Sequence, residues 1–231
     1  GAASPALVTD VNRSGSMEVF ETTFSDGGMV RCTIDHWMPG VTRSGKSQVS
    51  HGVTIPVLPK KRRFVEYIGS TSNAVSCRHR FLSPVSIDYL NVGELPLHPY
   101  VVGALLGGGS LNKDHVVITT ADEGILQKIL SLTPGLVEKA VPHKKGFCFT
   151  LYQVKDGKYG LLSNALREIG LARQTCEMKH IPERYLTASE DDRLELLAGL
   201  VDTDGTHNDF TQKSERLTRD FARLVRSLGG K

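Results

Sequence analysis

The first part of the chain carries short runs of β-branched and aromatic residues separated by turn residues. Val19–Phe24 and Met29–Thr33 flank a turn at 25–28, and this order predicts a β-hairpin. Val53–Leu58 and Phe64–Ile68 predict two further strands. We therefore expect the residues before about position 93 to be all-β.

Helical periodicity begins after this point and alternates with short strands. The predicted helices are 100–106, 121–132, 159–169, a helix capped by Ser189 that ends at Gly205, and 214–228. The predicted strands are 115–119, 136–141 and 147–154. Three acidic residues at 190–192 suit the positive end of a helix dipole. The whole pattern predicts an α+β protein with two domains, residues 1–92 and 93–231.

Two helical segments, 101–109 and 197–205, repeat one another at a spacing of 96 residues. Each is apolar, with glycine at its third position and a terminating glycine at its ninth. This spacing suggests two copies of one αββα-type unit, because solenoid repeats have shorter periods. The small residues Gly103, Ala198 and Gly199 would let the two helices approach backbone to backbone. We predict a helix interface there, on a pseudo-twofold axis.

The second copy places negative charge where a helix disfavours it. Asp202 and Asp204 lie at the C-terminal end of their helix, where the dipole costs roughly 0.3–1 kcal/mol for each. A hard divalent cation such as Mg²⁺ would offset them and is suited to phosphodiester cleavage. Alternatively, the aspartates end a surface helix and form its turn with Gly205. The residues alone leave both interpretations open.

Residues 197–205 differ at only two positions from the motif that names the LAGLIDADG homing endonucleases. Residues 179–186 resemble the Lys-x-Ile-Pro segment that leads into the second motif of intein-borne members. Residues 95–107 look like the first motif with its lead-in. The resemblance covers about residues 94–229. It implies αββα-type pseudo-repeats and a monomer that cleaves a long, asymmetric site in double-stranded DNA.

The same resemblance assigns roles to three residues. In the family, the acidic residue at the eighth motif position binds the metal, which implies Mg²⁺ at Asp204. The counterpart of Asp204 is Gly108, which offers only backbone, so double-strand cleavage is expected to be impaired or reduced to nicking. Lys179 resembles the basic residue beside the scissile phosphate, where it would stabilise developing negative charge. The alternative for Lys179 is an ordinary surface lysine.

Family members bind DNA with strands in the major groove and with Lys and Arg on phosphates. The candidates at or beside the predicted strands are His115, Lys139, His143, Lys144, Lys145, Gln153, Lys155 and Lys158. Clusters of basic residues are more often solvated surface, so the clusters carry little weight without the resemblance.

The first part of the chain resembles the Hint-like splicing domain of inteins. Residues 24–36 look like its hairpin that ends in a Thr-x-x-His motif, with Thr33 and His36 placed to polarise the peptide bond at the N-terminal splice junction. The partner implied is the host extein protein in cis, and the alternative is a capped turn with a surface histidine. The chain as given is expected not to splice, because residues 1–5 and 229–231 lack the junction residues.

Composition sets broader limits. Apolar residues at 39% and charged residues at 23% are ordinary for a globular protein. The four cysteines form no CxxC pair, which argues against a zinc site and a disulfide framework and fits a reducing, cytoplasmic location. No apolar run reaches membrane-spanning length and no signal peptide is recognisable. A net charge of +3 is too small to establish nucleic-acid binding.

Three functions remain open at this stage. The leading one is an intein that carries a site-specific, metal-dependent DNA endonuclease. The second is a decayed endonuclease domain that binds DNA or persists only as a folded insert. The third is a phosphate-binding enzyme that uses Gly107–Ser110, although this segment lacks the Gly-Lys-Ser or Gly-Lys-Thr ending of a P-loop.

Overall fold

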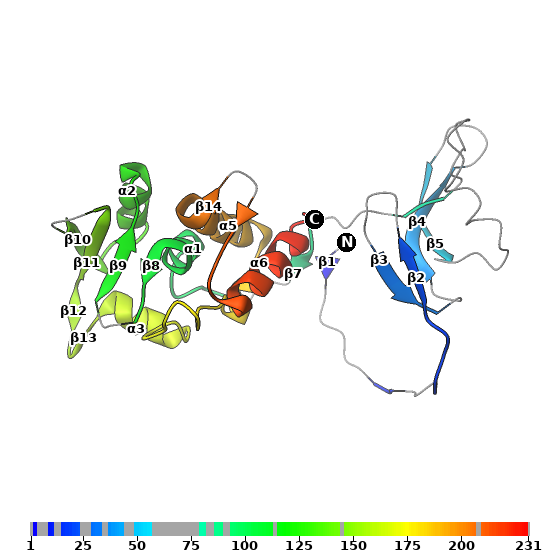
Figure 1. The fold of residues 1–231 in the computed structure, drawn as a ribbon, viewed down its shortest axis with the longest axis horizontal. Helices are drawn as coiled ribbons and strands as arrows, with labels where there is room; N and C mark the ends of the chain where they lie inside the picture. Colours follow the sequence, from blue (N-terminus) through cyan, green and yellow to red (C-terminus); the bar gives the residue numbers. More distant parts are fainter. Residues whose placement is uncertain are drawn as a thin grey trace. The chain divides into compact units, whose positions relative to one another are not determined.

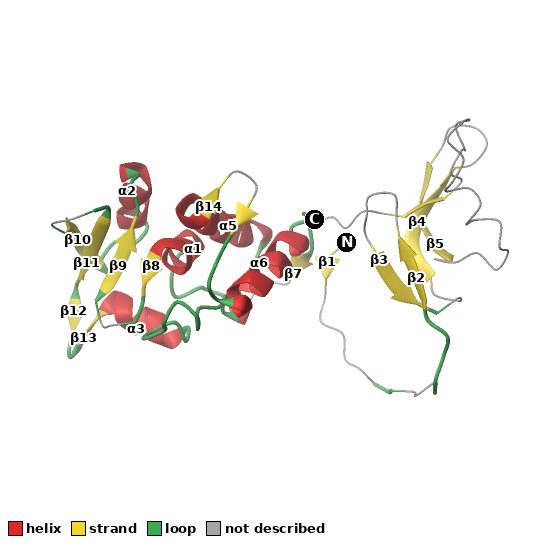
Figure 2. Cartoon of the chain, in the orientation of Figure 1, coloured by secondary structure: helices red, strands yellow, loops and turns green. Residues whose placement is uncertain are grey.

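The computed structural model describes residues 2–3, 9–11, 15–23, 29–33, 37–43, 49–56, 79–81, 86–89, 93–112, 115–143, 146–206 and 209–230. The chain divides into two compact units, one of Leu7–Ser83 and one of Gly1–Ala6 with Pro84–Lys231. The described residues form helices and several small sheets (Figures 1 and 2), a mixed α and β composition. The assignment of residues 1–92 and 93–231 to separate functions stays a prediction.

Within the unit Leu7–Ser83, the described regular structure is β-strand. β2 (Phe20–Thr23) and β3 (Met29–Cys32) pair antiparallel, which confirms the predicted hairpin. β4 (Trp37–Arg43) pairs antiparallel with β5 (Val49–Pro56) and with β6 (His79–Phe81). The predicted strand Val53–Leu58 overlaps β5, and the predicted strand Phe64–Ile68 lies outside the described residues.

The other unit holds the helices. They are α1 (Pro99–Gly108), α2 (Glu123–Ser131), α3 (Leu161–Glu168), α4 (Glu183–Leu186), α5 (Glu190–Asp204) and α6 (Glu215–Ser227). All except the one-turn α4 were predicted within a few residues of their bounds. The helix predicted from 159 begins at Leu161, because Tyr159–Gly160 is a strand that pairs with Lys155–Asp156. No helix among the described residues has the length and apolarity needed to cross a membrane.

Side-chain caps fix where three of these helices begin. Asp122 accepts a hydrogen bond from the backbone N–H of Gly124 at 2.7 Å, so α2 begins after it rather than at 121. Ser189 accepts one from Asp192 and begins α5, and Ser214 accepts one from Leu217 and begins α6, each at 3.1 Å. These acceptors satisfy N–H groups that have no partner inside the helix.

Antiparallel strands form a sheet in the order β10-β11-β9-β8, with α1, α2 and α3 packed against it (Figure 1). The strands are β8 (Gly109–Ser110), β9 (Val116–Thr119), β10 (Val137–Pro142) and β11 (Cys148–Gln153). Alternate residues such as Ile118 and Leu151 are buried, whereas Thr119 and Tyr152 are exposed. The sheet therefore presents one face to the core and one to solvent.

Short strand pairs complete this unit. β1 (Ala2–Ala3) pairs parallel with β7 (Asp88–Tyr89). β12 (Lys155–Asp156) pairs with β13 (Tyr159–Gly160), and β14 (Gly205–Thr206) pairs with β15 (Asp209–Phe210). The core gathers around α1, whose residues Val101, Val102, Leu105 and Leu106 have no exposed surface.

Candidate active site at the paired helix ends

Helices α1 and α5 lie side by side and run parallel (Figure 1). A Cβ added to Gly103 would lie 2.2 Å from the carbonyl oxygen of Leu196, and one added to Gly199 would lie 2.2 Å from that of Tyr100. Both glycines are therefore needed for the backbones to approach. Because 196 and 199 stand 96 positions after 100 and 103, exchanging the helices reproduces the contacts. The helices are thus related by an approximate twofold axis.

Of the three residues predicted at this interface, the structure places Gly103 and Gly199 at the crossing itself. Ala198 is half-buried and packs against the apolar core. The structure places the two helices in direct contact rather than far apart.

The two helices also end in the same way. The N–H of Gly109 donates to the carbonyl of Leu105, and the N–H of Gly205 donates to that of Val201, with both glycines in extended conformation. A Cβ on Gly107 would lie 2.1 Å from the Thr203 hydroxyl and 3.3 Å from the Cβ of Asp204. The C-terminal turns therefore meet, and the Asp204 carboxylate belongs to this junction.

Asp204 is half-buried, and among the described residues the side-chain amide of Gln212 donates to its Oδ2. Burial raises the pKa of the Asp204 carboxyl, and the positive charge of Lys179 opposes this shift. Gln212 was not singled out from the sequence, since no motif or spacing marks it. It reaches Asp204 because β14 and β15 form a tight hairpin that turns the chain back toward the end of α5.

Lys179 is only 4% exposed, so the interpretation as an ordinary surface lysine is wrong. Its Nζ donates to the carbonyl oxygens of Leu106 and Gly109 at 2.7 Å, and lies within 3.4 Å of two more from the same turn. The carbonyls of Leu106, Gly107 and Gly109 are among those that the end of a helix leaves without intrahelical partners, whereas that of Leu105 also accepts from the Gly109 N–H. Burial lowers the pKa of Lys179 to about 8, and the Asp204 charge opposes the shift. The ammonium therefore caps the C-terminus of α1.

Gly108 occupies the position that corresponds to Asp204, and no side chain fits there as the chain stands. A Cβ on Gly108 would lie 2.8 Å from the carbonyl oxygen of Thr119 and 3.3 Å from the Cβ of Thr203. Among the described residues, no group of three or more His, Cys, Asp and Glu side chains could hold a metal ion. A magnesium ion commonly takes one or two carboxylates together with substrate phosphates. That chemistry fits Asp204 and does not fit the end of α1.

Asp202 has a different place in the structure. Its Oδ2 accepts a hydrogen bond from the Tyr100 hydroxyl at 2.8 Å, which ties α5 to the first turn of α1. Burial raises the pKa of Tyr100, and the Asp202 hydrogen bond adds to this. The Lys128 ammonium lies 3.6 Å from the centre of the Tyr100 ring and 3.3 Å from the Glu195 carboxylate. Asp202 therefore belongs to a cluster that joins three helices.

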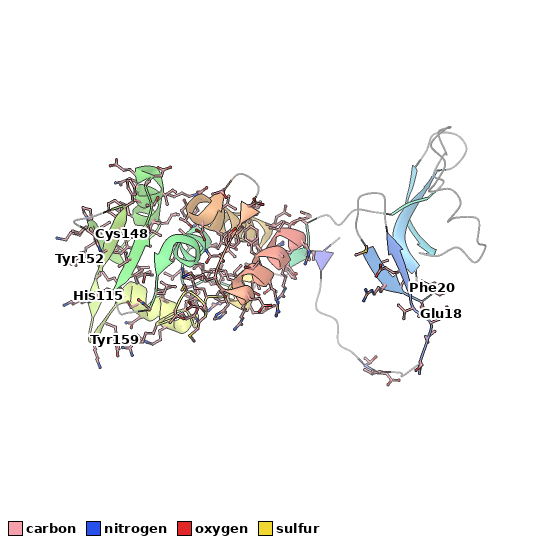
Figure 3. All side chains as sticks on the ribbon, in the orientation of Figure 1. Glu18, Phe20, His115, Cys148, Tyr152 and Tyr159 are labelled. Carbon is pink, nitrogen blue, oxygen red and sulfur yellow. The ribbon has the colours of Figure 1, made fainter. Side chains whose placement is uncertain are left out.

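The DNA-binding candidates lie on or near the exposed face of the sheet. Tyr152 and Cys148 project from that face, away from α1 (Figure 3). Lys139 pairs across the strands with Tyr152, and its ammonium lies 5.6 Å from the centre of the ring. The His143 Nε2 lies 2.8 Å from the Thr150 hydroxyl.

Four other DNA-binding candidates belong to the hairpin β12–β13 or lie outside the described residues. Lys155 and Lys158 are exposed in that hairpin, while Lys144 and Lys145 lie outside the described residues. His115 is exposed just before β9. Gln153, at the end of β11, is half-buried, and its Oε1 accepts a hydrogen bond from the N–H of Ser163 in α3 at 2.7 Å, so it does not belong to the outer side of the sheet.

The predicted splicing residues are described only in part. Thr33 follows β3 and is half-buried, whereas His36 lies outside the described residues. Cys32, Cys148 and Cys176 are free thiols. The geometry of the Thr-x-x-His motif thus stays a prediction.

Neither of two phosphate-binding motifs has a suitable context. Phosphate loops present the N-terminus of a helix, but Gly107–Ser110 forms the end of α1 and the start of β8. Gly40–Ser47 also has the G-x-x-x-x-G-K-S spacing of a phosphate loop. It begins in β4, and β5, which starts at Val49, pairs antiparallel with β4. The described part of the motif thus belongs to β4, and the next described element is the strand β5, whereas a phosphate loop is followed by a helix.

Comparison with known proteins gives one informative similarity. No family model matches the chain. The replicative DNA helicase DnaB of Mycobacterium intracellulare is 30% identical to it over 225 residues, which cover 91% of this chain and 34% of the helicase. The chain thus spans about a third of the length of the curated relative that it matches.

Proposed function

We propose that the chain carries the DNA-cleaving module of an intein inserted in a replicative helicase, with cleavage reduced to one strand. The observation that carries the proposal is the symmetric crossing of α1 and α5, at whose C-terminal junction the second motif places the carboxylate of Asp204 and the first motif places Gly108. The symmetric crossing of the two helices at matched glycines supports the interpretation that the module contains two repeats, each of which acts on one DNA strand. The loss of the second carboxylate supports action on one strand.

The extent of the similarity to the helicase supports an insert. The similarity covers nearly all of this chain but only about a third of the helicase. A helicase fragment that hydrolyses a nucleotide would need a phosphate loop at a helix N-terminus, and the described element that follows Gly40–Ser47 is the strand β5. A segment carried within a helicase accounts for both observations.

The chain would contribute binding and placement to the reaction. Asp204 and a DNA phosphate would hold Mg²⁺, and Gln212 would fix the orientation of the Asp204 carboxylate. A bound magnesium ion supplies Lewis acidity toward a phosphate and lowers the pKa of a bound water. Lys139, Lys155 and exposed neighbours of the sheet would bind the DNA backbone.

A second function, DNA binding without cleavage, is favoured by the closed space at Gly108. Restoring a carboxylate there by Gly108→Asp would push a Cβ against the carbonyl of Thr119, so restoration requires the backbone to move. The end of α1 would therefore have to rearrange to hold a second carboxylate, as expected of a module that no longer cleaves DNA.

A nicking assay separates these functions. The substrate is a supercoiled plasmid with the helicase gene sequences that flank the insert joined together, incubated with the chain and MgCl₂. We expect open circles, which the Asp204→Asn variant fails to produce, and no linear product. The matched control is Asp191→Asn, which removes an exposed carboxylate at the opposite end of α5. Site-specific retention of the plasmid without nicking would favour the second function, and no site-specific binding would refute both.

A further inference from the structure

The end of α1 holds a positive charge of its own. The last carbonyls of a helix carry partial negative charge, and a cation placed against them is stabilising. Here the Lys179 Nζ donates to the carbonyl oxygens of Leu106 and Gly109, on either side of Gly107 and Gly108. These contacts cover the position at which the first motif would present a metal ion.

The backbone of Lys179 is itself held in place. The buried hydroxyl of Ser214 donates to the Lys179 carbonyl at 2.6 Å, and the N–H of Ile181 donates to the Asp220 carboxylate at 3.0 Å. Both partners belong to α6 or its N-cap. Hydrogen bonds to α6 and its N-cap residue therefore fix the backbone from which the Lys179 side chain reaches the end of α1.

Position 108 supplies no side-chain ligand for a metal ion. Gly108 offers no oxygen beyond its backbone, and a Cβ there would approach the Thr119 carbonyl to 2.8 Å. An ion with two positive charges at the same carbonyls would also repel the Lys179 ammonium at short range. The end of α1 therefore does not fit the metal ion that two-strand cleavage requires.

We propose that the Lys179 ammonium is the resident cation of the α1 end and replaces a divalent ion there, so that the paired helix ends accept one metal ion, at Asp204. This inference rests on the proposed function for its metal site. It adds the reason why cleavage is confined to one strand. It also makes Lys179 a positioning residue, whose charge fixes the end of α1 beside Asp204.

The first test removes the charge and keeps the bulk. Lys179→Met retains most of the aliphatic volume, and we expect its unfolding temperature to fall by about 10 °C, because buried carbonyls lose their cation. Lys139→Met, at an exposed lysine, is the matched control and is expected to shift it by about 2 °C or less. An unchanged unfolding temperature in Lys179→Met would overturn the proposal, since only the methylene groups would then matter.

The second test uses the native chain, in case Lys179→Met does not fold. Acetylation of each lysine by a water-soluble ester is followed by mass spectrometry in EDTA and in MgCl₂. Since Lys179 is 4% exposed, we expect it to react at least about tenfold more slowly than Lys139 in both buffers. Reaction at the rate of Lys139, or exposure of Lys179 by Mg²⁺, would mean that the ammonium does not hold the α1 end.

The third test locates the metal without DNA. Any rise in unfolding temperature caused by MnCl₂ in the native chain should disappear in Asp204→Asn and persist in Asp191→Asn. A rise that survives in Asp204→Asn would place a metal elsewhere and overturn the inference. None of these measurements depends on nicking, so a failure of the proposed function would leave them interpretable.

Discussion

At the scale of single residues, two glycines determine how closely the paired helices approach. Gly103 and Gly199 face carbonyl oxygens of the opposite helix at distances that no Cβ can occupy. The contact is backbone to backbone, so the opposing atoms cannot move aside as a side chain would. Any larger residue at either position must separate the helices and move Asp204 relative to α1.

The first prediction follows from this contact. Gly103→Ala should lower the free energy of unfolding by about 3 kcal/mol or more, since overpacking against fixed backbone is costly. Gly124→Ala is the matched control, because its Cβ would meet only the flexible Asp122 side chain, at 3.0 Å. We expect it to change stability by less than about 1 kcal/mol in urea unfolding. Equal effects in the two variants would contradict the close crossing.

A second prediction concerns Gln212, which donates to Asp204. Gln212→Ala should raise the Mg²⁺ concentration for half-maximal nicking about 10- to 100-fold, as for other residues that orient a metal ligand. The maximal rate at saturating Mg²⁺ should change less. Gln127→Ala, at an exposed position of α2, serves as the control. A loss of maximal rate with unchanged Mg²⁺ dependence would assign Gln212 another role.

A third prediction concerns pH. The buried Tyr185 hydroxyl donates to the Leu97 carbonyl at 2.9 Å and accepts from the Leu97 N–H, and burial raises its pKa to about 12. The folded protein thus keeps this proton to a higher pH than the unfolded chain, whose tyrosines ionise near pH 10. The resulting stability is complete below pH 10 and is lost as the pH rises to 12, by at most about 1.4 kcal/mol per unit.

Urea unfolding between pH 9 and 12 measures this effect. The difference in stability between the native chain and Tyr185→Phe should shrink as the pH rises through this window. A difference that stays constant would mean that Tyr185 ionises equally in both states.

At the scale of elements, two buried cations neutralise helix C-termini. Lys179 serves α1, and the guanidinium of Arg193 donates to the carbonyl and hydroxyl of Ser227 at the end of α6. Arg193 also donates to Ile87, next to β7. Cations at these positions are stabilised by the helix dipole. In both cases a buried cation links the C-terminus of a helix to a residue that is distant in the sequence.

The fourth prediction compares two serine caps. Ser189 and Ser214 each accept a hydrogen bond from their own helix at 3.1 Å, but only Ser214 also donates to the Lys179 carbonyl. Ser189→Ala should cost about 1 kcal/mol, and Ser214→Ala should cost about 1–3 kcal/mol more, because it also leaves a buried carbonyl unsatisfied. Paired urea unfolding curves measure the difference. Equal costs would show that the link from α6 to Lys179 contributes little.

The elements themselves were largely predictable from the sequence. Hydrophobic periodicity and capping residues are local signals in the sequence. They predicted the bounds of α1, α5 and α6 to within a few residues. β12 and β13 are each two residues long, too short for an alternation of buried and exposed residues to show, and the helix predicted from 159 therefore included both residues of β13.

At the scale of the whole molecule, the described apolar core of the larger unit comes from residues 95–228. The segment Leu7–Ser83 forms a separate compact unit. The residues on either side of that segment meet as β1 and β7, which pair in parallel. The larger unit thus has the contacts of an independently folding domain.

The fifth prediction tests this independence. Replacing residues 7–83 by a short Gly-Ser linker should leave a protein with the helical circular dichroism of the larger unit. Its thermal unfolding should be cooperative and fall within about 5 °C of the corresponding transition of the full chain. Loss of cooperativity, or of helix, would show that the β-rich unit is required for this core to form.

The sequence by itself determined the repeated helices, their glycines and the acidic end of the second copy, because helix period and motif spacing are properties of neighbouring residues. Only the tertiary structure decided what surrounds that end. Lys179 caps a helix more than 70 positions earlier, Gln212 reaches Asp204 through a hairpin, and Thr119 closes the space at Gly108. These contacts depend on how α6 and the sheet pack against α1, which no local pattern encodes.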